Sequence, residues 1–193
     1  MSAHRSAAAA ARAAASDAEL VVRVLNGDRE GYSILVRRHQ DALFRHARGM
    51  GLDADTAEDL VQDAFVKAYV SLAECRDPAR FRAWVFRILR NGCLDHARDI
   101  RRRTVSLEDV PGCADASATA AADRAELRLV IGRALDTLPA ALRDAFLLKH
   151  QAGYTYEEMA DIAGCSVSAM KMRVHRARDA LMTYLAPEDA TAP

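Results

Sequence analysis

One stretch near the C-terminus, residues 155–178, most constrains what this chain can fold into. Thr155 and Glu158 stand at the spacing of a capping box, which predicts the start of a short helix. Gly164 can take the left-handed conformation that ends such a helix, and Ser166 can cap a second one. A helix, a glycine turn and a second helix form the pattern of a helix-turn-helix, whose second helix enters the major groove of DNA.

The predicted second helix has an apolar face and a basic face. Its inward stripe is Val167, Met170, Val174 and Ala177. Its other face carries Lys171, Arg173, His175, Arg176 and Arg178. The alternative interpretation of this stretch is an ordinary pair of helices with a solvated basic face.

The rest of the chain shows helical periodicity without the alternation expected of strands, and this predicts an all-α fold. Glycine and proline are scarce and stand at the joints between segments. The predicted helices run from Asp17 to Asn26, from Asp28 to about Met50, from near Asp55, from Pro78 or Ala79 to Arg101, from Asp123, and from Pro139. Asp55 and Glu58 stand at the spacing of another capping box.

Composition divides the 193 residues into two helical modules. Residues 104–122 are small, polar and mildly acidic, with too few large apolar groups to offset the entropy of ordering them. The expected organisation is a disordered tail (1–16), a first module (17–103), an acidic flexible linker (104–122), a second module with the helix-turn-helix (123–187) and a short tail (188–193).

Several functional classes are disfavoured by composition. No continuous apolar run approaches the length of roughly 18 residues that a membrane span requires, so we expect no membrane insertion. The alanine-rich N-terminus is not typical of a secretory signal. Four scattered cysteines suit a reducing compartment, and we expect a cytoplasmic protein without a bound metal or other cofactor. The formal net charge is zero, which suggests that DNA binding depends on a partner.

The predicted fourth helix carries a second cluster of basic residues. Between Arg80 and Arg103 there are eight arginines against Asp95 and Asp99, which is an electrostatic signature of phosphate binding. Trp84, the only tryptophan, lies among them with Phe81. Aromatic rings beside arginines can stack on unpaired bases, but for both rings the favoured interpretation is burial in the core.

The predicted third helix has a polar, acidic patch. Asp59, Gln62 and Asp63 lie beside an apolar edge of this helix. Such a patch suits docking onto a basic helix of another protein, although a solvated helix face would have the same composition.

Taken in order, these motifs resemble the bacterial sigma-70 family, in its small extracytoplasmic-function (ECF) branch. The matching stretches are Asp55-Thr-Ala-Glu-Asp-Leu-Val-Gln-Asp-Ala-Phe65, Phe81-Arg-Ala-Trp84-Val-Phe-Arg-Ile88-Leu-Arg-Asn91, Asp95-His-Ala-Arg98 and the helix-turn-helix with Arg176-Ala-Arg178. The resemblance covers residues 17–185. It implies a transcription-initiation factor without enzymatic activity.

The resemblance assigns a role to each module. The first (σ2) would bind the β′ clamp helices of core RNA polymerase and would read and melt the −10 element. The second (σ4) would read the −35 element in duplex DNA and touch the β flap, while the acidic linker would lie in the RNA-exit channel. A cognate anti-sigma factor is a further expected partner.

The site residues follow from matching positions. Polymerase binding is expected at Asp59, Leu60, Gln62, Asp63 and Phe65. Contacts to the −10 element are expected from Arg76, Asp77, Arg80, Trp84, Arg87, Arg90, Asn91 and Arg98. Contacts to the −35 element are expected from Ser166, Ser168, Lys171, Met172, Arg173, His175, Arg176 and Arg178. Met172 stands where a serine is commoner, and it cannot donate the hydrogen bond that a serine would.

Two other functions remain open on the sequence. A free-standing helix-turn-helix regulator would bind duplex DNA unaided as a dimer. The sequence has no evident helix for dimerisation, and such a regulator would leave the basic, aromatic first module without a role. A metal- or thiol-dependent enzyme could use Cys93 and His96, but the sequence lacks a nucleophile, base and orienting group or a glycine-rich cofactor loop.

Overall fold

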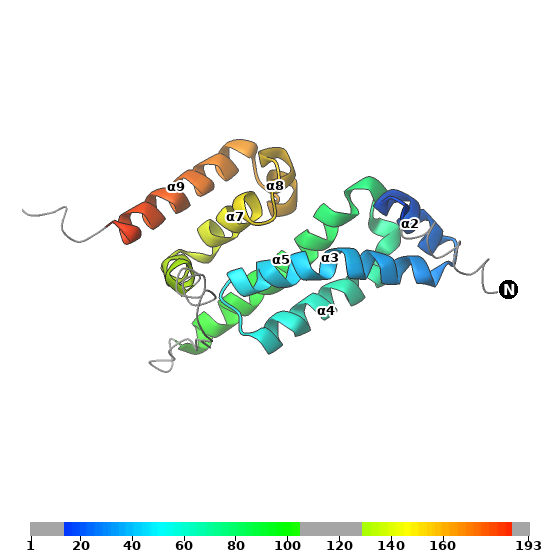
Figure 1. Ribbon diagram of the computed structural model, residues 1–193, viewed down its shortest axis with the longest axis horizontal. Helices are drawn as coiled ribbons and strands as arrows, with labels where there is room; N and C mark the ends of the chain where they lie inside the picture. Colours follow the sequence, from blue (N-terminus) through cyan, green and yellow to red (C-terminus); the bar gives the residue numbers. More distant parts are fainter. Residues whose placement is uncertain (1–13, 105–128, 187–193) are drawn as a thin grey trace, which may run out of the picture.

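The protein is represented by a computed structural model, which describes residues 14–104 and 129–186. Regular structure within these ranges is helical throughout, which confirms the predicted all-α fold of two helical domains (Figure 1). The first module contains α2 (Asp17–Leu25), α3 (Arg29–Gly49), α4 (Ala54–Val70), the 3-10 turns η1 (Leu72–Glu74) and η2 (Pro78–Arg80), and α5 (Phe81–Thr104). The second contains a helix over residues 129–136, α7 (Ala140–His150), α8 (Tyr156–Ala163) and α9 (Val167–Leu185).

Capping residues set where the first helices begin. The Ser16 side chain accepts from the Glu19 amide at 3.3 Å, and the Glu19 carboxylate accepts from the Ser16 amide at 2.8 Å. At α4 the cap is Asp53, whose Oδ1 accepts from the Thr56 amide at 2.9 Å. The predicted Asp55–Glu58 capping box is therefore wrong, because the helix begins at Ala54 and Asp55 lies inside its first turn.

The predicted fourth helix is divided at its start and longer at its end. Pro78–Arg80 forms a 3-10 turn in which the Asp77 side chain accepts from the Ala79 amide at 3.0 Å. The α-helix follows from Phe81 and continues to Thr104, beyond the predicted end at Arg101. Most of the predicted linker (105–122 of 104–122), residues 123–128 of the next predicted helix, residues 1–13 of the predicted N-terminal tail (1–16) and the whole C-terminal tail (188–193) lie outside the described residues. Of the remainder, Ser16 caps α2 and Thr104 is the last residue of α5.

The core of the first module is built from large side chains of α2, α3 and α5. Leu20, Leu35, Phe81, Phe86 and Leu89 are almost completely buried. Phe81 is thus a core residue, as its aromatic character predicts. α4 closes this core through Ala57, Ala64 and Ala68, so its opposite face is left for other contacts.

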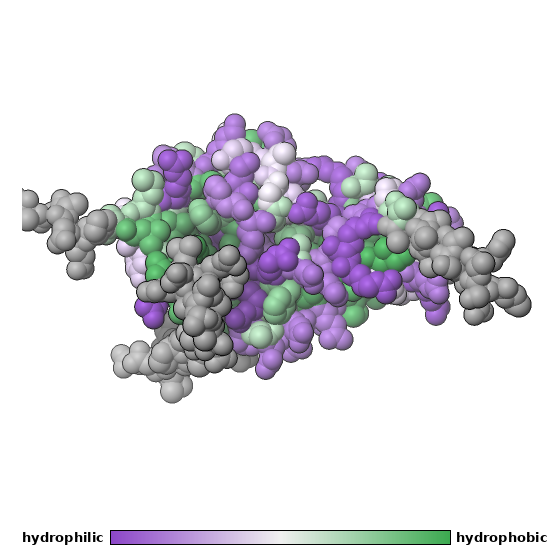
Figure 2. Space-filling model, in the orientation of Figure 1, coloured by the Kyte–Doolittle hydropathy of each residue, from purple (hydrophilic) through white to green (hydrophobic). Residues whose placement is uncertain are grey.

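The second module buries Leu148, Met159, Met170 and Val174 among α7, α8 and α9. It does not lie apart from the first module: α5 contacts α7 and α8, and α3 contacts α7 (Figure 1). On the face seen in Figure 2, hydrophilic residues cover most of the middle of the molecule. Of the helices in the described ranges, none is both long enough and apolar enough to cross a membrane.

Candidate nucleic-acid interface

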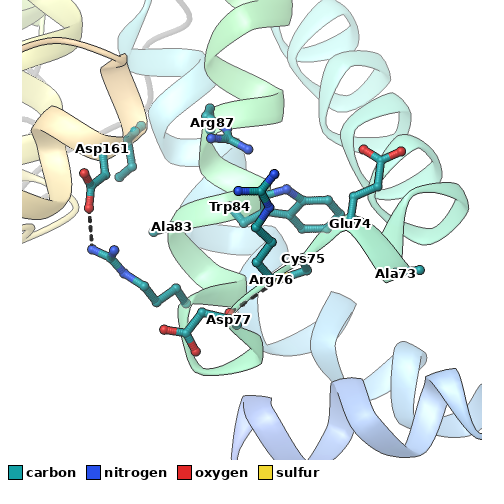
Figure 3. Close-up of a pocket in the computed structure, with 11 residues that line it drawn as sticks. Ala73, Glu74, Cys75, Arg76, Asp77, Ala83, Trp84, Arg87 and Asp161 are labelled. Atoms are coloured by element: carbon teal, nitrogen blue, oxygen red, sulfur yellow. Dashed lines mark hydrogen bonds and ion pairs between the residues drawn. The ribbon is translucent and has the colours of Figure 1, made fainter.

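A cavity of about 750 Å³ lies where the loop between α4 and α5 meets the first turns of α5 (Figure 3). The 3-10 turns shape this loop, and the buried Cys75 anchors it, with its Sγ 3.5 Å from the carbonyl oxygen of Asp77. The cavity is lined by Ala73, Glu74, Cys75, Arg76, Asp77, Arg80, Ala83, Trp84, Arg87, Asp161 and Ile162. Five side chains predicted to contact the −10 element, namely Arg76, Asp77, Arg80, Trp84 and Arg87, are therefore brought together in one place.

The chemistry of this cavity suits an unpaired nucleotide. Trp84 is only half-buried, and its ring lies between the loop and the Arg87 side chain (Figure 3). Its ring centroid is 6.1 Å from that of the buried Phe81, and the two rings are tilted by 50°. An aromatic surface flanked by exposed guanidinium groups can stack a base and bind its phosphate.

The other side chains predicted to contact the −10 element lie further along α5 in different environments. Asn91 is exposed, and the exposed Arg98 pairs with Asp95 at 2.9 Å. Arg90 is 8% exposed, and its Nε donates to Asp144 of the second module at 2.6 Å. In this arrangement Arg90 does not face solvent, and its contact with the −10 element stays a prediction.

The helix-turn-helix forms as its sequence predicts. The Thr155 hydroxyl accepts from the Glu158 amide at 3.2 Å, and the Glu158 carboxylate accepts from the Thr155 amide at 2.8 Å. Gly164 ends α8 with φ of 62°, in the left-handed region that a residue with a Cβ rarely adopts. Ser166 caps α9 by accepting from the Ala169 amide at 3.1 Å.

Most of the side chains predicted to contact the −35 element share one accessible surface. Ser166, Ser168, Lys171, Met172, His175, Arg176 and Arg178 are exposed. Arg173 differs, because it is half-buried and its Nη1 lies 3.8 Å from Cys165 Sγ. Lys171 is also placed by α8, since its Nζ lies 5.7 Å from the centroid of the Tyr156 ring.

The predicted polymerase-binding residues lie on α4. Asp59, Gln62 and Asp63 are exposed, Leu60 is half-buried and Phe65 is buried. Asp59, Gln62 and Phe65 also line a groove between α3 and α4, together with Tyr32 and the exposed Val66 and Tyr69. The Tyr32 hydroxyl donates to the Phe65 carbonyl at 2.5 Å, which ties the two walls of the groove together. Tyr32, Val66 and Tyr69 were not predicted as part of this surface.

Cys93 and His96 do not form a reactive pair. Cys93 is buried, and burial together with the nearby Asp144 carboxylate raises the pKa of its thiol to about 12. Within residues 14–104 and 129–186, His, Cys, Asp and Glu side chains do not gather into groups of three or more that could hold a metal.

Sequence reasoning missed several residues of the contact between the modules, among them His46, Arg82, Arg143, Asp144 and Asp161. None carries a local signal, because each partner lies on the other module, far away in the sequence. The Arg90–Asp144 pair, for example, joins residues 54 positions apart.

Comparisons with known proteins decide the family. Residues 35–103 match the family Sigma-70 region 2, and residues 128–181 match Sigma-70, region 4. The chain is 34% identical to ECF RNA polymerase sigma factor SigM of Mycobacterium tuberculosis over 171 residues, which cover 88% of this chain and 85% of SigM. This chain belongs to the ECF branch of the sigma-70 family.

Other relatives agree with this assignment. The ECF RNA polymerase sigma-E factor of Escherichia coli is 30% identical over 190 residues, covering 89% of this chain and 95% of the relative. The structure of CnrH in complex with the cytosolic domain of CnrY matches with a TM-score of 0.67 and 32% identity, over 91% of this chain and 99% of CnrH. A sigma factor RpoE solved with the anti-sigma factor NepR from Bartonella quintana matches with a TM-score of 0.65 and 28% identity. The match covers 80% of this chain and 96% of RpoE. The function of this ECF sigma factor is promoter-specific initiation of transcription.

Proposed function

We propose that this sigma factor binds core RNA polymerase through α4, reads the −35 element with α9, and captures an unpaired base of the −10 element in the cavity beside Trp84. The observation that carries the proposal is that two different DNA-binding chemistries lie on two different modules. A basic recognition helix suits duplex DNA, whereas an aromatic cavity rimmed by arginines suits a melted strand.

The proposed domain boundaries follow from this division of labour. Residues 17–103 act as the domain that binds polymerase and the −10 element, and residues 123–187 act as the domain that binds the −35 element. Residues 104–122 connect them as an acidic linker, for which we propose a path through the RNA-exit channel.

The −10 step requires that a base leave the stack, which costs a few kcal/mol. Stacking of the base on Trp84 offsets this cost by about 1–3 kcal/mol of binding free energy. Arg76, Arg80 and Arg87 supply phosphate contacts around the same cavity. A preformed cavity keeps the entropy lost on binding low, so the protein favours the melted state of the promoter without any chemical step of its own.

The −35 step uses the exposed face of α9. Lys171, Met172, His175 and Arg176 face the bases, and Arg178 binds a phosphate. Arginine can donate two hydrogen bonds to one guanine, which is the commonest specific contact in the major groove. Because Met172 offers only an apolar contact, we expect it to select for a thymine methyl group or for no base at its position.

The proposed protein partners dock on the first and second modules. Asp59, Gln62 and Asp63 give α4 an exposed acidic rim beside the apolar groove, and this suits the β′ clamp helices. The β flap is the proposed partner of the second module. An anti-sigma factor is a further proposed partner, supported by the similarity to a sigma factor solved with NepR. Because these partners are expected in the cytoplasm, we propose that the protein acts there.

Run-off transcription with purified core polymerase tests this function. Core polymerase alone, core polymerase with this protein, and core polymerase with the Asp63→Arg variant are each given a library of promoter fragments. We expect specific transcripts with the unmodified protein, none with core polymerase alone, and fewer with the Asp63→Arg variant. Tight duplex binding by the protein alone, without transcripts in the presence of polymerase, would instead indicate a free-standing regulator.

A further inference from the structure

The second module packs against the N-terminal half of α5, which also forms one wall of the −10 cavity. Three arginines of η2 and α5 end on acceptors of the second module. Arg80 Nη2 lies 2.6 Å from Asp161 Oδ2, Arg82 Nη2 donates to the Ala152 carbonyl at 2.6 Å, and Arg90 Nε donates to Asp144 Oδ2 at 2.6 Å. Basic groups of η2 and α5 therefore make much of the contact between the modules. From the other side, Arg143 Nη1 of α7 donates to the Met50 carbonyl at 2.8 Å.

Asp144 is the centre of this contact. It is completely buried, and its second oxygen, Oδ1, lies 3.3 Å from Nε2 of the equally buried His46. Burial opposes ionisation, but the interactions with His46 and Arg90 hold the pKa of Asp144 below its ordinary value of 3.8. Both partners belong to the first module, so the carboxylate stays compensated only while the modules are together.

Packing around this ionic cluster is close. The rings of Phe86 and Tyr154 meet edge to face at 5.3 Å, and Arg82 lies over the Tyr154 ring at 4.6 Å. A Cβ on Gly49 would come within 2.9 Å of the Leu147 side chain. Such complementarity across the two modules indicates a specific interface and not a loose encounter.

The interface has unequal effects on the two DNA-binding surfaces. Asp161 and Ile162 of α8 form part of the wall of the −10 cavity, and the Asp161 carboxylate is paired with Arg80 (Figure 3). A carboxylate in that place competes with a DNA phosphate for the same guanidinium group. By contrast, Lys171, His175 and Arg176 on α9 remain exposed.

We propose that the chain on its own holds a closed, self-inhibited arrangement. Arg90, Asp144 and His46 form an inter-module latch, and Asp161 occupies the place on Arg80 that a phosphate of the −10 strand would take. The Arg80 guanidinium and the wall of the −10 cavity that α8 now lines become free only when the latch opens, whereas α9 is accessible in both arrangements. The inhibitory consequence rests on the proposed −10 function, but the closed arrangement itself does not.

The latch can be tested without polymerase or promoter. We would measure the radius of gyration by small-angle X-ray scattering. We would also measure the quenching by acrylamide of Trp84, the only tryptophan, which lines the −10 cavity together with Asp161 and Ile162 of α8. In the Asp144→Asn variant, loss of the carboxylate charge leaves Arg90 buried without a counter-ion. We expect the ratio of open to closed molecules to rise about 100-fold or more. Both the radius and the quenching should therefore increase.

Two further variants separate the latch from general damage. Asp179→Asn removes an exposed carboxylate that pairs with His175 inside the second module at 3.4 Å, and it should leave both readings unchanged. The charge swap of Arg90→Asp with Asp144→Arg should be more compact than either single variant, because opposite charges face each other again. Circular dichroism of each variant checks that its helices persist.

The closed arrangement also predicts how a pool of random-sequence single-stranded DNA oligonucleotides binds. Asp144→Asn should bind the pool more tightly than the unmodified chain, with additional loss of Trp84 fluorescence. An unmodified chain that is already extended in solution would overturn the proposal. So would a charge swap no more compact than the single variants, or an Asp144→Asn variant as compact and as poorly quenched as the unmodified chain.

Discussion

Arg176 and Arg178 lie close together on α9, and both side chains are exposed. We assign Arg176 to a base and Arg178 to a phosphate. Replacing Arg176 with alanine should cost about 1–3 kcal/mol at one position of the −35 element and leave other positions unchanged. Replacing Arg178 should weaken binding to all sequences by a similar factor. Binding titrations with single-base variants of the −35 duplex measure both effects, and a uniform loss for Arg176→Ala would reassign it to a phosphate.

We expect the Cys93 thiol to be chemically inert in the folded protein. Raising its pKa from 9.0 to about 12 lowers the thiolate fraction near neutral pH about a thousandfold. Iodoacetamide near neutral pH should therefore leave Cys93 unmodified in the folded protein and modify it after denaturation, as followed by peptide mass spectrometry. Rapid labelling of Cys93 in the folded protein would contradict its burial in the core of the first module.

At the scale of helices, the turn at Gly164 fixes the angle between α8 and α9. A Cβ at this position meets no neighbouring atom within 4 Å, so the cost of Gly164→Ala comes from the positive φ alone. We expect about 1–2 kcal/mol of destabilisation. Gly132, inside the helix over residues 129–136, also has open space around it, and Gly132→Ala should stabilise by about 0.5–1 kcal/mol. Thermal unfolding compares the pair, and equal shifts would show that backbone conformation is not the cause.

The exposed face of α4 is the proposed docking surface for core polymerase. Reversing the charge with Asp63→Arg should weaken binding to core polymerase at least about tenfold, because a like charge opposes a basic docking helix. Asp41→Arg, an equally exposed reversal on α3 outside the predicted set, is the matched control. Affinity for core polymerase, measured by fluorescence anisotropy, should fall only for Asp63→Arg; unchanged affinity would remove α4 from the docking surface.

The helices and their buried faces were predictable because each leaves a local signal in the sequence. The capping box at Thr155 and the left-handed Gly164 were identified correctly, since spacing and residue type determine both. The start of α4 was not, because Asp53 and Asp55 both suit a cap and only the helix geometry selects Asp53. In the candidate site, the side chains from Arg76 to Arg87 that were predicted to contact the −10 element do gather around one cavity.

At the scale of the whole molecule, the contact between the modules was not predictable. Arg90 belongs to a run of arginines that suggests a DNA-binding face, and only its distant partner Asp144 distinguishes it from Arg87. The same holds for Asp161, which by sequence is an ordinary exposed acid of α8. The sequence suggests that the arginines of α5 form one continuous DNA-binding surface. In the structure Arg87 is exposed, whereas Arg90 is buried against the second module by its pairing with Asp144.

We propose that the two modules read two separate promoter elements for one polymerase. The most direct test is transcription by core polymerase from a randomised promoter library with the unmodified protein, with Arg176→Ala and with Trp84→Ala, followed by sequencing of the active promoters. We predict two preferred sequence blocks with the unmodified protein, of which Arg176→Ala changes only the upstream block and Trp84→Ala only the downstream one. A single block, or changes in both blocks from either variant, would contradict the account.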